Sequence, residues 1–167
     1  TWWQANKALQ ALPIEWDLGD NAKESSATID ARLEQGLSAD DAFLGNEAGD
    51  VDAAIAAAAR TIQADYAYPF QNHAPMEPMN ATALWNENRC EVWCPTQNGE
   101  SALAATSEAA ELPIEMCDVH KLNLGGGFGR RGGHDFVTQA VRIARQMPGT
   151  PVKLLWTREE DMQHGMY

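Results

Sequence analysis

Apolar and polar positions divide the chain into two halves of different character. In the first half, apolar residues at helical spacing predict a helix over residues 1–12, and an alanine-rich run predicts a second over 51–59. Apolar and polar residues alternate over 61–70, which predicts a strand. Between the two helices, residues 18–52 hold nine acidic and two basic residues and few large apolar ones. We expect that stretch to be an acidic surface linker, with one helical turn around residues 29–33.

The second half predicts a unit in which strands and helices are mixed. Asn86-Glu87-Asn88 separates two apolar runs, which is typical of a hairpin. Further on, Thr157 with Glu160 three residues later is typical of the start of a short helix. The expected strands cover 79–85, 89–94, 114–122 and 152–156, the last one buried, and the expected helices cover 97–110 and 135–147. This order predicts an α+β fold, an antiparallel or mixed sheet with packed helices.

The charge of the chain excludes one class of partner. The sequence has 24 acidic and 12 basic residues and a formal net charge of −12. Such a surface repels phosphate backbones, so we expect no nucleic-acid partner. No run of 18 apolar residues is present, so we expect no transmembrane segment. Residues 121–167 differ from the rest, with seven basic and four acidic residues, so this is where any anionic ligand is expected to bind.

The cysteine and histidine residues show no metal-binding pattern. Cys90, Cys94 and Cys117 are an odd number, and the four histidines are scattered without the spacing of a zinc site. We therefore expect buried structural thiols and no metal ion held directly by the protein.

A dense glycine cluster at residues 125–133 is the strongest local signal. It lies between an expected strand and an expected helix. Glycines there let the backbone approach a ligand with its N–H groups pointing outward, and a helix that begins near Gly133 would add its positive end.

The same cluster also fits a different ligand. Residues 127–132 satisfy G-x-G-x-x-G, the pattern of a dinucleotide-binding (Rossmann-like) oxidoreductase domain. Arg130 and Arg131 are bulky for such a turn, and Glu159 lies later than the usual spacing of about 20 residues. This domain, and a non-catalytic interaction domain, remain alternatives.

Two further motifs place polar side chains on a restrained backbone. In the stretch His73-Ala74-Pro75-Met76-Glu77-Pro78-Met79-Asn80, two prolines restrain the backbone that presents His73 and Glu77. The stretch Trp93-Cys94-Pro95-Thr96-Gln97 ends an expected strand with an amide that can donate into a pocket. Each motif by itself fits a structural loop as well as a site.

Taken together, in this order and spacing, the motifs resemble a known family. The chain resembles the large, molybdopterin-binding subunit of the xanthine dehydrogenase and aldehyde oxidase family, above all the beta subunit of bacterial isoquinoline 1-oxidoreductase and its aldehyde-oxidising relatives. The resembling stretches also include Trp2-Trp3-Gln4-Ala5, Ile14-Glu15-Trp16-Asp17, Leu124-Gly125-Gly126-Gly127-Phe128-Gly129-Arg130-Arg131 and Pro151-Val152-Lys153-Leu154-Leu155-Trp156-Thr157-Arg158-Glu159-Glu160-Asp161.

The resemblance also implies a division of the chain. The family's subunit is several times longer, so this chain would be an internal fragment. Residues 1–17 would then be the end of an upstream helix–strand unit, 18–52 the acidic linker, and 53–167 the N-terminal part of the molybdopterin-binding domain.

The resemblance implies roles for particular residues. In this family a glutamine placed like Gln97 hydrogen-bonds the apical oxygen ligand of molybdenum. Purine-oxidising members carry a glutamate at the position of Gly132, so a purine substrate is not expected. The family's general base, a glutamate near the far C-terminal end, is not expected in this fragment. The glycine loop would bind the cofactor through its backbone amides. Its two arginines would either neutralise cofactor phosphate or face solvent. The expected cofactor-binding residues are Gly125, Gly126, Gly127, Phe128, Gly129, Arg130 and Arg131.

The implied parent enzyme is a molybdenum hydroxylase that oxidises N-heteroaromatic compounds or aldehydes with water as the oxygen source. Its cofactor would be molybdopterin with molybdenum, in the cytosine dinucleotide form. Its electrons would leave through [2Fe–2S] clusters on a partner, the iron–sulfur small subunit. The isolated fragment is expected to be inactive, and both the bacterial periplasm and the cytoplasm are open as its compartment.

Overall fold

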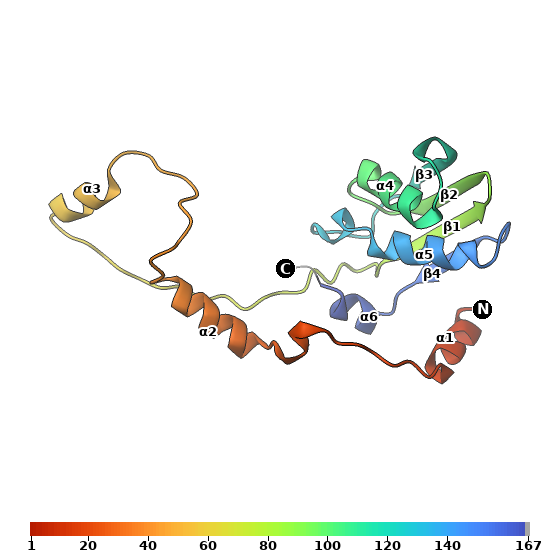
Figure 1. Ribbon diagram of the computed structural model, residues 1–167, viewed down its shortest axis with the longest axis horizontal. Coiled ribbons are helices and arrows are strands. Elements are labelled where there is room, and N and C mark those ends of the chain that lie inside the picture. The colour runs from red at the N-terminus through yellow and green to blue at the C-terminus, as the bar shows by residue number, and fades with distance from the viewer. Residues whose placement is uncertain (166–167) are drawn as a thin grey trace. The chain divides into compact units, whose positions relative to one another are not determined.

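The computed structural model describes residues 1–165 of the 167, so the last two residues of the expected 53–167 domain lie outside it. The chain forms two compact units, Thr1–Ala67 and Tyr68–Tyr167 (Figure 1).

The first unit consists of helices without a core. Its helices are α1 (Trp2–Ala11), α2 (Ser26–Gly36) and α3 (Val51–Ala57), with a 3-10 turn at Asp20–Lys23. No residue of Thr1–Ala67 is buried. Each α-helix begins at a capping side chain, namely Thr1, Ser25 and Asp50, which satisfies a free backbone N–H.

Two expectations for residues 1–70 need correction. The single turn expected at 29–33 is an eleven-residue helix, because Ser25 and Thr28 form a reciprocal cap at its start. The strand expected at 61–70 is wrong, since these residues form no strand. A stretch of alternating apolar and polar residues forms a strand only where a neighbouring strand supplies backbone hydrogen bonds, and no described strand pairs with this stretch.

The second unit is a four-stranded mixed sheet in the order β3-β2-β1-β4, with helices α4 and α5 packed on one face (Figure 1). The strands are β1 (Asn80–Asn86), β2 (Arg89–Cys94), β3 (Cys117–Lys121) and β4 (Val152–Leu155), and the helices are α4 (Gly99–Ala110), α5 (Asp135–Arg145) and α6 (Arg158–Gln163). The predicted α+β fold with a mixed sheet is confirmed. The predicted hairpin is confirmed too, and because Asn86 pairs with Arg89 only Glu87 and Asn88 form its turn.

The sheet and helices meet through small side chains. Every second residue of β2 is buried, and so are Ala81 and Ala83 of β1, as expected for strands with one covered face. The helices can approach closely because many of the core residues are alanine or cysteine. The core comprises Met79, Ala81, Ala83, Cys90, Val92, Cys94, Ala102, Ala109, Ala110, Cys117, Phe136, Val137, Ala140, Val141, Ala144 and Trp156.

Two strands differ from expectation. The strand expected at 114–122 begins with the 3-10 turn Ile114–Met116, and only Cys117–Lys121 is extended. Strand β4 was expected to be buried, but its residues are half-buried or exposed because it is an edge strand.

The topology argues against a dinucleotide-binding unit. In such a unit, the strand after the glycine loop and its helix lies parallel beside the first strand. Here the loop follows β3 at one edge of the sheet, and the next strand, β4, lies at the opposite edge beyond β2 and β1.

The three cysteines are buried and unpaired, as expected. Burial raises the pKa of Cys90 to about 12 and that of Cys94 to about 11, so both thiols stay protonated and unreactive at neutral pH. Among residues 1–165, no cluster of three or more potential metal ligands occurs. Within the same range, no helix has the length and apolar character needed to cross a bilayer.

Candidate functional site

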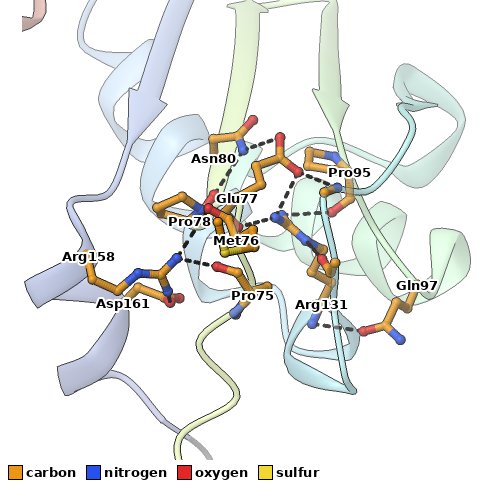
Figure 2. Close-up of polar contacts among 12 residues, drawn as sticks. Pro75, Met76, Glu77, Pro78, Asn80, Pro95, Gln97, Arg131, Arg158 and Asp161 are labelled. Carbon is orange, nitrogen blue, oxygen red and sulfur yellow. Dashed lines mark hydrogen bonds and ion pairs between the residues drawn. The ribbon is translucent and has the colours of Figure 1, made fainter.

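The three motifs singled out in the sequence meet at one end of the sheet (Figure 2). Strands β2 and β3 run parallel and both end there, and β1, antiparallel to β2, begins there. The motif that holds His73 and Glu77 leads into β1, Gln97 follows β2, and the glycine loop of residues 125–129 follows β3. The direction of the strands therefore brings together segments that are 20 to 50 residues apart in sequence.

Glu77 is bound to the glycine loop through both its backbone and its side chain. Its backbone N–H donates to the Gly125 carbonyl at 3.0 Å, and its Oε2 accepts from the Gly125 N–H at 2.8 Å. A Cβ on Gly125 would lie 2.4 Å from the Glu77 Cβ, so only glycine permits this approach. Asn80 donates to Oε1 and holds the carboxylate from the other side (Figure 2).

Arg131 ties all three segments together. Its side chain is fully buried, and its guanidinium donates to Glu77 Oε2 at 2.9 Å, the Glu77 carbonyl at 2.6 Å and the Gly126 carbonyl at 2.7 Å. A further N–H points at the Pro95 carbonyl at 3.4 Å. Burial lowers the pKa of Arg131, and the Glu77 carboxylate opposes that shift. The alternative in which this arginine faces solvent is therefore wrong, and its guanidinium holds the loop in place.

Arg130 is also buried, so the solvent-facing alternative is wrong for it as well. Its guanidinium forms a two-point contact with Asp135 at 3.1 and 2.7 Å and lies 5.3 Å from the centre of the Trp156 ring. The helix expected to begin near Gly133 is α5, which begins at Asp135. A 3-10 turn, Arg130–Gly132, separates the loop from α5, and the first turn of α5 carries the Asp135 carboxylate. Contact of either arginine with cofactor phosphate stays a prediction.

Gln97 both holds the loop and presents a free donor. Its Oε1 accepts from the backbone N–H of Gly129 at 3.0 Å and of Arg131 at 3.2 Å. Two N–H groups directed at one atom identify that atom as the carbonyl oxygen, which fixes the orientation of the amide. The Nε2 group donates to no described residue, and Gln97 is exposed. A Cβ on Gly127 would lie 2.5 Å from the Gln97 Oε1, so a side chain there would displace the Gln97 amide.

The tip of the loop has three consecutive free backbone donors. Within the described part of the chain, the N–H groups of Gly126, Gly127 and Phe128 have no hydrogen-bond partner. Gly126 and Phe128 have positive φ angles of 94° and 54°. Left-handed residues among consecutive N–H groups are typical of a concave anion-binding backbone. With the Gln97 amide beside them, these donors fit an anionic, oxygen-rich ligand.

His134 supports the site and was missed by sequence reasoning. Its ring nitrogens lie 2.8 Å from Thr96 Oγ1 and 3.1 Å from Ser101 Oγ, and Thr96 Oγ1 donates to the Arg131 carbonyl at 3.3 Å. Burial lowers the pKa of His134, so the ring is neutral at neutral pH. The only signal in the sequence was its place directly after the glycine cluster. Its partners lie more than 30 residues away, and no local pattern reports them.

A family model and several known proteins match the chain. A family model described as the molybdopterin cofactor-binding domain matches residues 37–166. The chain is 30% identical over 161 residues to a membrane-bound aldehyde dehydrogenase [pyrroloquinoline-quinone] of Gluconacetobacter polyoxogenes, covering 95% of this chain and 21% of that protein. It is 29% identical over 107 residues to isoquinoline 1-oxidoreductase subunit beta of Brevundimonas diminuta, covering 64% of this chain and 13% of that protein. The chain thus spans about a fifth of the length of the first relative and a smaller share of the second.

A solved structure shares the fold. Aldehyde oxidoreductase from Desulfovibrio gigas superposes with a TM-score of 0.51 and 21% identity, covering 57% of this chain and 10% of that one. At this identity the similarity concerns the fold alone.

Proposed function

Because the chain belongs to the molybdopterin cofactor-binding domain family, we propose that it is one segment of the large subunit of a molybdenum hydroxylase. The parent enzyme oxidises an aldehyde or hydroxylates an N-heteroaromatic carbon, with water as the oxygen source. The relatives named above as an aldehyde dehydrogenase and an isoquinoline oxidoreductase support both substrate classes.

The observation that carries the proposal is the row of free donors at the loop. Three backbone N–H groups, at Gly126, Gly127 and Phe128, and the Gln97 Nε2 have no partner among the described residues. Donors fixed in advance by the surrounding structure stabilise negative charge without having to reorganise. The bonds from Glu77 and Arg131 supply that rigidity at this loop.

Each group has a distinct role in the proposed site. The loop N–H groups bind the pterin side of the cofactor, and the Gln97 amide donates to an oxygen ligand of the metal. Bound molybdenum supplies the two-electron oxidation chemistry, and the chain supplies position and hydrogen bonds. The general base is contributed by another part of the parent protein. The cytosine dinucleotide form of the cofactor and [2Fe–2S] clusters on a small partner subunit complete the proposal, and the designation of one relative as a beta subunit supports a multi-subunit enzyme.

The test is the cofactor content of the full-length parent protein. We expect about one molybdenum and one molybdopterin per large subunit, and no molybdenum in the isolated 167-residue chain. The assay must also measure pyrroloquinoline quinone, because one relative carries that cofactor in its name. A parent protein that contains the quinone and neither molybdenum nor pterin would refute the proposal.

A further inference from the structure

His73 lies beside the glycine loop and has no assigned role. It is half-buried, and its Nδ1 is buried without a hydrogen-bond partner in the described part of the chain. Its Nε2 lies 3.9 Å from the position that a Cβ on Gly129 would occupy. No other atom outside the neighbouring residues lies within 4 Å of that position, so Nε2 is the side-chain atom nearest to this face of Gly129.

The surroundings of His73 indicate which nitrogen carries the proton. A neutral imidazole has one N–H donor and one acceptor nitrogen. A buried donor without a partner is rarer in proteins than a buried acceptor without one. Nδ1 is the buried and unpartnered nitrogen, so the proton belongs on Nε2, which faces the loop.

The segment that carries His73 is held firmly on both sides. The Asn72 side chain donates to the Met162 carbonyl and accepts from the Ala74 N–H. Arg158, paired with Asp161, donates to the Pro75 carbonyl (Figure 2). Ala74 is kept at a positive φ of 35°, a conformation that persists only where the surrounding structure enforces it. The backbone on both sides of His73 is therefore fixed, which restricts where the imidazole can lie.

We propose that the His73 Nε2–H donates a hydrogen bond to an anionic oxygen of the molybdopterin cofactor seated on the glycine loop. This inference rests on the proposed function, because it assumes that the loop binds that cofactor. His73 thereby extends the row of donors formed by the loop N–H groups and Gln97. It adds a side-chain contact from the segment before β1, which otherwise only supports the loop.

The test compares three variants of the full-length parent enzyme. His73→Ala removes the donor, His73→Gln keeps an N–H near the position of Nε2, and Met76→Ala changes a side chain of the same segment that is 91% exposed. The readouts are molybdopterin per subunit, from pterin fluorescence after oxidative release, and the rate of pterin loss on dilution. The melting temperature of each variant controls for folding.

We expect His73→Ala to lose the pterin about ten-fold faster or more, as for loss of a hydrogen bond to a charged group. His73→Gln restores retention to near the wild-type rate, and Met76→Ala matches wild type. Protein from cells grown without molybdate identifies the acceptor. Faster pterin loss there too assigns the oxygen to the phosphate, and a loss confined to metal-loaded protein assigns it to a molybdenum ligand.

Two results would overturn the inference. Unchanged retention in His73→Ala means that the imidazole contacts no cofactor atom. Equal loss in His73→Ala and His73→Gln means that the ring shapes the segment and does not act as a donor. A wild-type parent protein without any pterin is a separate outcome, which defeats the proposed function itself.

Discussion

Two substitutions of Gln97 separate its contact with the loop from its proposed donation to the cofactor. Gln97→Ala removes both the Nε2 donor and the Oε1 acceptor that binds the N–H groups of Gly129 and Arg131. Gln97→Glu retains an oxygen at the acceptor position and removes only the donor. Comparing the two variants distinguishes a group that acts on the cofactor from one that holds the loop.

The hydrogen bonds of Gln97 determine how much turnover and cofactor retention each variant should lose. Loss of one oriented donor lowers turnover by about 10²–10³-fold, and this loss is expected in both variants. Only Gln97→Ala also breaks two hydrogen bonds to the loop. At roughly 1 kcal/mol each, these amount to about 2 kcal/mol, or about a thirty-fold weaker hold on the bound cofactor. An exposed amide with no structural bonds would predict almost no such second effect.

The assay measures kcat per bound molybdenum and cofactor occupancy in the full-length enzyme. Normalising to molybdenum matters because the new carboxylate of Gln97→Glu also repels an anionic cofactor. We expect both variants to lose turnover, with the faster cofactor loss on dilution in Gln97→Ala. A Gln97→Glu enzyme with wild-type kcat per molybdenum would refute the donor role, and a Gln97→Ala enzyme with wild-type retention would refute the loop-holding role.

Three further predictions concern the glycine loop, His134 and the acidic segment of residues 18–52. Gly127→Ala should reduce cofactor loading in the parent enzyme, because its Cβ would lie 2.5 Å from Gln97 Oε1, whereas Gly132→Ala has open space and should load normally; pterin and molybdenum analysis checks both. Burial holds the pKa of His134 below its usual 6.5, so the folded state binds fewer protons than the unfolded one. This contribution to the free energy of unfolding is fully present above pH 6.5 and is lost as pH falls through the pKa of the folded state. Urea unfolding should show this pH dependence in wild type and a weaker one in His134→Gln. Residues 18–52 should exchange their amide protons faster than the sheet and helices of residues 80–145, since none of them is buried, and slow exchange across the whole segment would contradict this.

Some features of this protein are determined by residues close together in the sequence. The helix at the N-terminus, the hairpin of β1 and β2 and helix α5 were all predicted, because periodicity and turn residues act over a few positions. The cap formed by Thr157 on the Glu160 N–H was predicted for the same reason. The sequence also singled out Gln97 and the glycine loop, since dense glycine and a polar amide at a strand end are local signals.

Only the tertiary structure decided what these residues contact. The arginines after the loop are both buried, because Glu77 and Asp135 supply acceptors in the interior, and sequence alone left them equally able to face solvent. The proposed donor role of the Gln97 Nε2 depends on Oε1 being occupied by loop N–H groups 32 and 34 residues away. The strand expected at 61–70 failed for the converse reason, since its pattern was present but no described strand pairs with it. Local signals select a conformation, but burial and hydrogen-bond partners depend on which distant segments the sheet brings together.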